Sequence, residues 1–118
     1  MQQVQTIMMT DIIGFTELSR QEKGKIRAIS QKHGRTIRDT VSEHGGSLIN
    51  IFGDSALALF TAPGNALRCA IGIQQQCARH PGIPMRIALH CGEIIREGEE
   101  VYGDAINLTS RILKVARK

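Results

Sequence analysis

The sequence predicts an α+β domain, an α/β sandwich whose elements follow the order βαββαβ. Short apolar runs rich in β-branched residues alternate with two longer stretches in which apolar residues recur at the helical period. The second and third apolar runs are separated only by Gly53-Asp54-Ser55, which is typical of a β-hairpin. This order packs two helices on one face of a four-stranded, mostly antiparallel sheet, the ferredoxin-like arrangement.

The first strand is expected at residues 4–10, which are apolar and bounded by polar residues, with Asp11 at its C-terminal end. Ser19 and Glu22 then stand at the spacing of a helix capping box. A long amphipathic helix follows them. Gly45-Gly46 is expected to end this helix, because a positive φ is easy for glycine.

The two hairpin strands are expected at residues 47–52 and 56–60, which places Asp54 at the hairpin tip. In a ferredoxin-like sheet the first strand lies beside the hairpin strands. Asp11 and Asp54 are far apart in the sequence, but we therefore expect them side by side at one edge of the sheet.

A second amphipathic helix is expected after residues 63–65, which mark a loop and a cap, and before residues 80–84, whose two prolines break it. Residues 85–90 form the next strand, with alternate side chains on opposite faces. Residues 94–95 extend the sheet.

Composition limits the classes of function. The 118 residues, 42% of them hydrophobic, suffice for one domain, residues 1–118. The net charge of +4 and the basic residues between Arg20 and Arg38 favour anionic partners or a solvated helix face. An aromatic content of 3% without Trp argues against a nucleic-acid partner, because stacking platforms need rings.

Neither a membrane-spanning run nor a signal peptide is recognisable, so we expect no direct membrane contact in this segment. The expected location is the cytoplasm, or the cytoplasmic side of a membrane-bound parent. Cys69, Cys77 and Cys91 are odd in number and form no CxxC pair, which predicts buried, reduced thiols.

Asp11 and Asp54 are candidates for a metal site. Two carboxylates on neighbouring strand ends can bind a pair of divalent cations that stabilise the attacking and leaving oxygens of a phosphoryl displacement. Gly14 permits close backbone approach, and the amides of Phe15 and Thr16 begin a helical turn that favours an anion. Together they would form a nucleoside triphosphate site. The alternative is that Asp11 caps a helix and Asp54 serves a tight turn.

Four segments of the chain resemble successive signatures of one family, in its order and at its spacing: TDIIGFTELS, GGSLINIFGDSALALF, MRIALHCGEII and VYGDAINLTSRI. On these segments, which cover nearly the whole chain, the sequence resembles the class III adenylate/guanylate cyclase catalytic domain of the nucleotidyl cyclase family. The resemblance implies that ATP or GTP is converted to a 3′,5′-cyclic nucleotide and pyrophosphate. It also implies a head-to-tail homodimer, or a paired cyclase domain, with active sites built from both chains.

By this resemblance, Asp11 and Asp54 hold two Mg²⁺ or Mn²⁺ ions, with the carbonyl of Ile12 as a further ligand. One metal activates the ribose 3′-hydroxyl for in-line attack on the α-phosphate, and the other holds the triphosphate. Asn107 and Arg111 match family residues of the opposite chain that orient the ribose and stabilise charge at the α-phosphate. Their spacing of four places both on one helix face, which suits one substrate but also an exposed polar face.

Two departures from the family pattern qualify this interpretation. Asn50 and Glu100 fall at the positions that read the purine, where Lys and Asp are usual for adenine; Glu100 keeps the acceptor character, which slightly favours ATP over GTP. The chain stops at Lys118, so the family's C-terminal hairpin and its triphosphate-binding Lys are expected to be missing, and this fragment alone is expected to lack full activity. The alternative is a non-catalytic cyclase homology domain, a nucleotide-binding or dimerising regulatory module.

Overall fold

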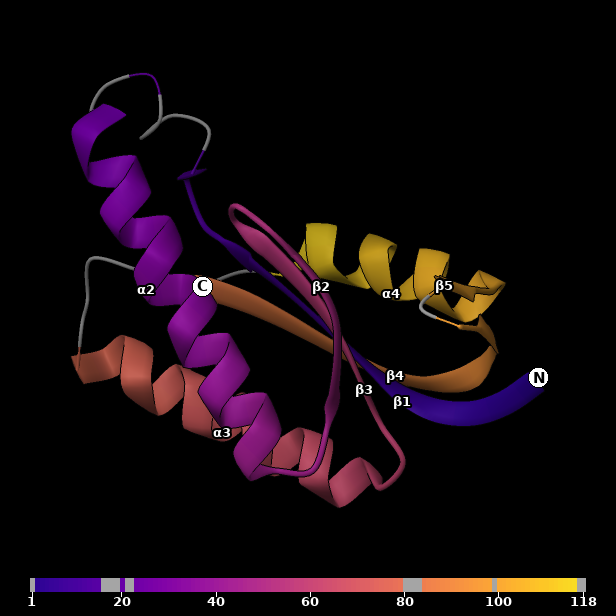
Figure 1. The fold of residues 1–118 in the computed structure, drawn as a ribbon. Coiled ribbons are helices and arrows are strands. Elements are labelled where there is room, and N and C mark those ends of the chain that lie inside the picture. The colour runs from indigo at the N-terminus through magenta and orange to yellow at the C-terminus, as the bar shows by residue number, and fades with distance from the viewer. Residues whose placement is uncertain (1, 16–19, 21–22, 80–83, 99, 117–118) are drawn as a thin grey trace.

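The computed structural model describes residues 2–15, 20, 23–79, 84–98 and 100–116. Figure 1 shows the fold. In chain order the elements are β1 (Gln2–Ile12), α2 (Lys23–Glu43), β2 (Ser47–Phe52), β3 (Ser55–Phe60), α3 (Pro63–Arg79), β4 (Met85–Glu97), β5 (Glu100–Tyr102) and α4 (Asp104–Val115). The predicted βαββαβ order is confirmed, and β5 and α4 follow it.

The sheet has the strand order β2-β3-β1-β4-β5, and each neighbouring pair is antiparallel. The central strand, β1, pairs with β3 on one side and β4 on the other. The prediction of four strands was wrong by one, because β5 pairs with the end of β4. At three residues, β5 is too short to show an alternating pattern. The predicted strand and its extension form one continuous β4.

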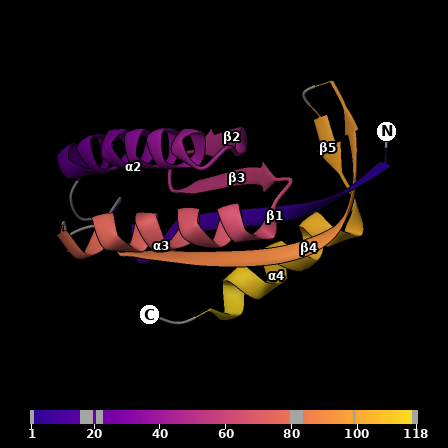
Figure 2. The same cartoon turned by 90° about the horizontal axis from the view of Figure 1, so that it is seen from below.

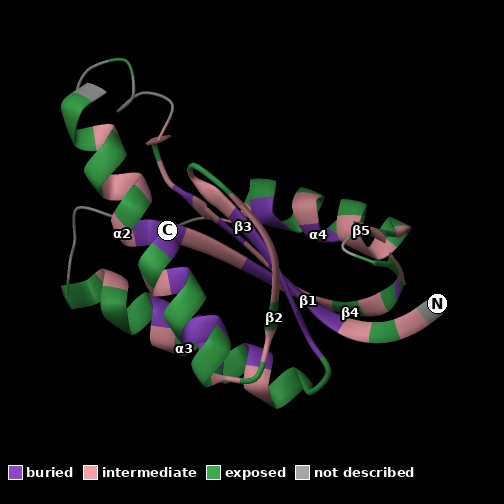
Figure 3. Ribbon diagram, in the orientation of Figure 1, coloured by how far each residue is buried: buried purple, intermediate pink, exposed green. Residues whose placement is uncertain are grey.

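Alternating residues of β1 face two separate hydrophobic clusters. Met8 and Ile12 pack with residues of α2 and α3, whereas Ile7 packs in a cluster that includes residues of α4. The two helices α2 and α3 therefore cover one face of the sheet, as predicted, and α4 covers the other. Figure 2 shows α4 beyond β4, on the side away from α2. In Figure 3 the buried residues concentrate where the strands meet the helices.

The helix ends follow local rules. After α2, Gly45 has a φ of +72°, which confirms the predicted glycine stop. Residues 63–65 form the first turn of α3 rather than a loop, because Pro63 has its φ preset and needs no amide partner at that position. The predicted capping pair, Ser19 and Glu22, and the predicted break at 80–83 lie outside the described residues.

The cysteines differ in exposure. Burial raises the pKa of the Cys69 thiol to about 11, so this group is an unreactive part of the core. Cys77 is half-buried, but Cys91 is exposed, and the prediction of buried thiols was wrong for it. In the described part of the chain, no helix combines the length and hydrophobicity that crossing a membrane requires.

Candidate functional site

The fold brings Asp11 and Asp54 to the same place. Asp11 stands directly opposite Ser55 in the β1–β3 ladder, so the end of β1 meets the β2–β3 turn. The amide of Ile12 donates a hydrogen bond of 2.9 Å to the Asp54 carbonyl. Both aspartates line one cleft of about 400 Å³, together with Asn50. The predicted proximity of the two aspartate residues is confirmed.

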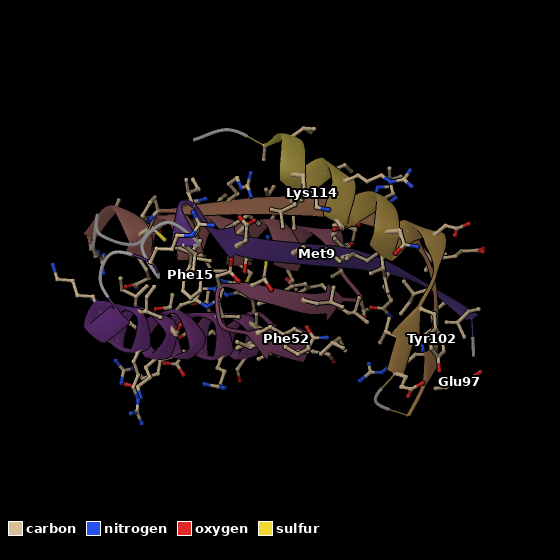
Figure 4. All side chains as sticks on the ribbon, turned by 90° about the horizontal axis from the view of Figure 1, so that it is seen from above. Met9, Phe15, Phe52, Glu97, Tyr102 and Lys114 are labelled. Carbon is tan, nitrogen blue, oxygen red and sulfur yellow. The ribbon has the colours of Figure 1, made fainter. Side chains whose placement is uncertain are left out.

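This cleft, the aspartate cleft, lies between the sheet and α4. Met9 and Leu57 contribute to it from β1 and β3. Ser110, Leu113 and Lys114 line it from α4. In Figure 4, Lys114 lies on α4 above Met9 of β1. The cleft thus combines two carboxylates with a lysine at its helical wall, an arrangement suited to a ligand that carries both cations and phosphates.

The Asp11 carboxylate has a partner that was not predicted from the sequence. Arg86 stands directly opposite Asp11 in the β1–β4 ladder. Its Nε donates to Oδ1 of Asp11 at 2.9 Å and its Nη2 to Oδ2 at 2.5 Å, which makes a bidentate ion pair. This pairing raises the pKa of the Arg86 guanidinium. The sequence carries a signal for the side of the sheet on which Arg86 lies. Side chains alternate along β4, so Arg86 lies on the opposite face from Ile87, away from the cluster that packs against α2 and α3.

The donors at the cleft suit a hard cation. The carboxylates of Asp11 and Asp54, which line the cleft, and the carbonyl of Ile12, the next residue of β1, are all oxygen ligands, which Mg²⁺ and Mn²⁺ prefer. Among the described residues, no group of three or more His, Cys, Asp or Glu side chains could hold a metal ion. Mg²⁺ is commonly bound by one or two carboxylates plus water and substrate phosphates, so this small donor set fits it.

The segment after β1 turns sharply. The amide of Ile13 donates to the Pro84 carbonyl at 2.9 Å, and Gly14 follows with a φ of +75°. Phe15 packs its ring against the α2 and α3 cluster. Thr16, the third residue expected to bind phosphate, lies outside the described residues. The anion-binding role of this turn therefore stays a prediction.

Asn107 and Arg111 line a different cleft. This α4 cleft, of about 800 Å³, lies between α4 and β4 and includes His90. Both residues are exposed on α4, and Ser110 and Lys114 of the same helix line the aspartate cleft instead. Within one chain, α4 thus stands between the two groups of site residues.

The two residues expected to read the purine are also apart. Asn50 is half-buried in β2 and lines the aspartate cleft. Glu100 is exposed in β5 and accepts a hydrogen bond from the Tyr102 hydroxyl. Since β2 and β5 are the two edge strands, one chain holds these residues at opposite edges of its sheet.

One buried histidine lies near the hairpin turn. His33 of α2 is 1% exposed, and neither ring nitrogen has a hydrogen-bond partner with good geometry among the described residues. Burial lowers the pKa of its ring, and the nearby Asp54 carboxylate and Gly53 carbonyl partly offset this effect. The sequence predicts no role for His33, because a single histidine without ligand spacing carries no pattern.

The fold and the site together define a class of protein. It is an antiparallel α+β domain with two aspartates beside the end of its central strand and an Asn–Arg pair on the helix that covers one face of the sheet. Several known proteins are similar to this chain in sequence or in structure. The chain is 28% identical to an adenylate cyclase of Streptomyces coelicolor, over 92% of this chain and 29% of that protein. It is 30% identical to the serine/threonine-protein kinase pkn2 of Myxococcus xanthus, over 94% of this chain and 14% of that protein.

A solved adenylate/guanylate cyclase/hydrolase from Silicibacter pomeroyi superposes with a TM-score of 0.88 at 26% identity, over 99% of this chain and 73% of that one. The chain matches no protein-family model. By its fold and its sequence relatives, it is similar to the class III adenylate and guanylate cyclase domains. It spans less than a third of the length of the two relatives above.

Proposed function

We propose that this domain is a purine nucleotidyl cyclase that converts ATP, or less readily GTP, to the 3′,5′-cyclic nucleotide and pyrophosphate. The observation that carries the proposal is that Asp11 and Asp54, remote in sequence, line one cleft at the end of β1. The adenylate cyclase named among the relatives supports the same activity. Such a reaction belongs to intracellular signalling and places the domain in the cytoplasm.

In this proposal Asp11, Asp54 and the Ile12 carbonyl hold two Mg²⁺ or Mn²⁺ ions. When bound, these cations activate the ribose 3′-hydroxyl and neutralise the triphosphate. Residues of the chain itself bind the phosphates. The turn at Gly14 and Phe15 presents backbone amides to phosphate oxygens, and Thr16 is the next residue in the sequence. The Lys114 ammonium group, at the wall of the same cleft, adds a positive charge near the phosphates.

The second half of the catalytic site comes from a second cyclase domain. Asn107 and Arg111 line the α4 cleft, on the other side of α4 from the aspartates of their own chain. A head-to-tail homodimer would present these two residues to the partner's aspartate cleft, where they orient the ribose and stabilise charge on the α-phosphate. Asn50 and Glu100 lie at opposite edges of the sheet. The same pairing of two chains would therefore bring Asn50 of one chain and Glu100 of the other within reach of one purine base.

The test is product formation by the full chain. We expect cyclic nucleotide from ATP with Mn²⁺, less from GTP, and none from either in Asp54→Ala with its circular dichroism spectrum unchanged. The products are separated by chromatography. Absence of a cyclic product from both nucleotides, with Mn²⁺ or Mg²⁺, in a folded protein that carries these residues together with the family's C-terminal hairpin contradicts the proposal.

A second candidate is a non-catalytic cyclase homology domain that binds nucleotide or a partner domain. Arg86 favours it, because the Asp11 carboxylate is already neutralised by this side chain. The similar segment of the serine/threonine-protein kinase pkn2 is a small part of that protein, which supports the role of a regulatory module within a larger protein. Nucleotide binding by calorimetry, without turnover, would favour this candidate over the first.

A further inference from the structure

The Asp11–Arg86 pair occupies the carboxylate that the proposed metal site needs. Both oxygens of Asp11 accept a hydrogen bond from the guanidinium, at 2.9 Å and 2.5 Å. A bidentate pair of this kind fixes the carboxylate plane as well as its charge. Asp11 is therefore oriented and neutralised without any metal ion.

The pair is partly shielded from water and preformed by the sheet. The side chains of Arg86 and Asp11 are 26% and 17% exposed, so solvent screens their attraction less than that of a surface pair. Their backbones are fixed opposite one another in the β1–β4 ladder. The sheet thus holds the two side chains within reach of one another.

A third contact holds the guanidinium on its other side. Nη1 of Arg86 donates to the Lys114 carbonyl at 3.4 Å, near the C-terminal end of α4. The last carbonyls of a helix lack partners within the helix and favour cations. Arg86 is thereby held between Asp11 and α4, beside the aspartate cleft that Lys114 also lines.

We propose that Arg86 is a positioning residue that acts through Asp11: it holds the carboxylate in place and competes with the divalent cation for it, and so sets the metal affinity of the site. This inference rests on the proposed function. A carboxylate offers about four lone-pair positions, so Arg86 does not exclude a cation sterically. It weakens the site because its positive charge must be displaced from the Asp11 carboxylate when the ion binds.

The experiment measures Mn²⁺ binding to the full chain without nucleotide, by isothermal titration calorimetry. We expect Arg86→Gln to bind Mn²⁺ roughly ten-fold more tightly than wild type, from the usual strength of a hydrogen-bonded charge pair. Arg86→Lys keeps the charge without the planar fork, and its affinity should fall between the two. Asp11→Asn should lose binding.

Arg68→Gln is the matched control, because it removes the same charge from an exposed residue of α3 that bonds to Asn65 instead. Its Mn²⁺ affinity should stay within about two-fold of wild type, since Arg68 is exposed to solvent and its hydrogen bond goes to Asn65 rather than to Asp11 or Asp54. If Arg68→Gln tightens binding as much as Arg86→Gln, the effect is one of net charge and the proposal is overturned.

A second measurement needs no variant. In the wild-type chain, the NMR signal of the Arg86 Nε–H should shift and exchange faster with water as Mg²⁺ is added, because its hydrogen bond to Asp11 is lost. An unmoved Arg86 signal at saturating Mg²⁺ overturns the proposal.

The outcomes separate this inference from the proposed function. Equal Mn²⁺ affinity in wild type and Arg86→Gln, with binding lost in Asp11→Asn, overturns the role of Arg86 and leaves the metal site intact. No Mn²⁺ binding to wild type or to Arg86→Gln overturns the metal site of the proposed function, and this inference with it.

Discussion

The amide of Ile12 donates a 2.9 Å hydrogen bond to the carbonyl of Asp54. This bond joins the end of the central strand to the turn between β2 and β3. It follows that the geometry of the turn controls the distance between the two carboxylates, and that a change in the turn reaches the proposed metal site through the backbone.

Gly53 is the residue through which this control can be tested. Its φ of +46° lies in the left-handed region, whereas a Cβ there would meet nothing closer than the Phe15 ring at 3.9 Å. Gly53→Ala should therefore lower the free energy of unfolding by about 1 kcal/mol through backbone strain alone. It should also weaken Mn²⁺ binding by shifting Asp54.

Gly98→Ala is the matched control, because Gly98 has a φ of +61°, open space around it and a place in the β4–β5 turn. It should cost a similar free energy in urea denaturation and leave Mn²⁺ binding unchanged. If both variants weaken Mn²⁺ binding equally, the turn has no special control over the site.

Gly92 fixes the approach of α4 to β4. A Cβ at this position would lie 2.5 Å from Cβ of Ala105, which no packed structure tolerates. Gly92→Ala should destabilise the chain by about 1–3 kcal/mol and displace the start of α4, which carries Asn107. Adding Ala105→Gly should recover part of the loss. A double-mutant cycle on unfolding free energies measures this coupling, and additive effects would show that the contact is not the cause.

His33 predicts a pH dependence of stability. Burial lowers the pKa of its ring below the usual 6.5, so between the two values the unfolded chain binds more protons than the folded one. The contribution of the neutral ring to stability is therefore complete above pH 6.5 and is lost as the pH falls through the folded value.

The variant His33→Leu removes this titration and two unpartnered polar atoms from the core. Its unfolding free energy should fall less than that of wild type between pH 7 and pH 5, as measured by urea denaturation at each pH. A parallel decline in the two proteins would contradict the effect of burial on His33, which NMR titration of the ring would then locate near its usual pKa.

Much of the fold follows from local patterns in the sequence. The apolar run of β1, the helical period of α2 and the turn residues at 53–55 predict the element order, and known topology then places Asp11 beside Asp54. These predictions hold because each depends on neighbours in the chain. β5 was missed because three residues carry no readable period.

The remainder of the site depends on long-range register. The Asp11–Arg86 pair exists because β1 and β4 align with these residues opposite one another, and no local pattern sets that alignment. The exposure of Cys91 and the isolation of His33 likewise depend on which surfaces pack together. The separation of Asn107 from the aspartate cleft depends on where α4 crosses the sheet.

The central claim is that one chain supplies Asp11 and Asp54 while a second supplies Asn107 and Arg111. The most direct test mixes two variants of the full chain, Asp54→Ala and Arg111→Ala, and measures cyclic nucleotide formed with Mn²⁺. Each variant alone should be inactive. The mixture should recover up to about a quarter of wild-type activity, because about half of the dimers are mixed and each mixed dimer contains one intact site of two. An inactive mixture, in which native mass spectrometry shows mixed dimers and wild type is active, would contradict the claim.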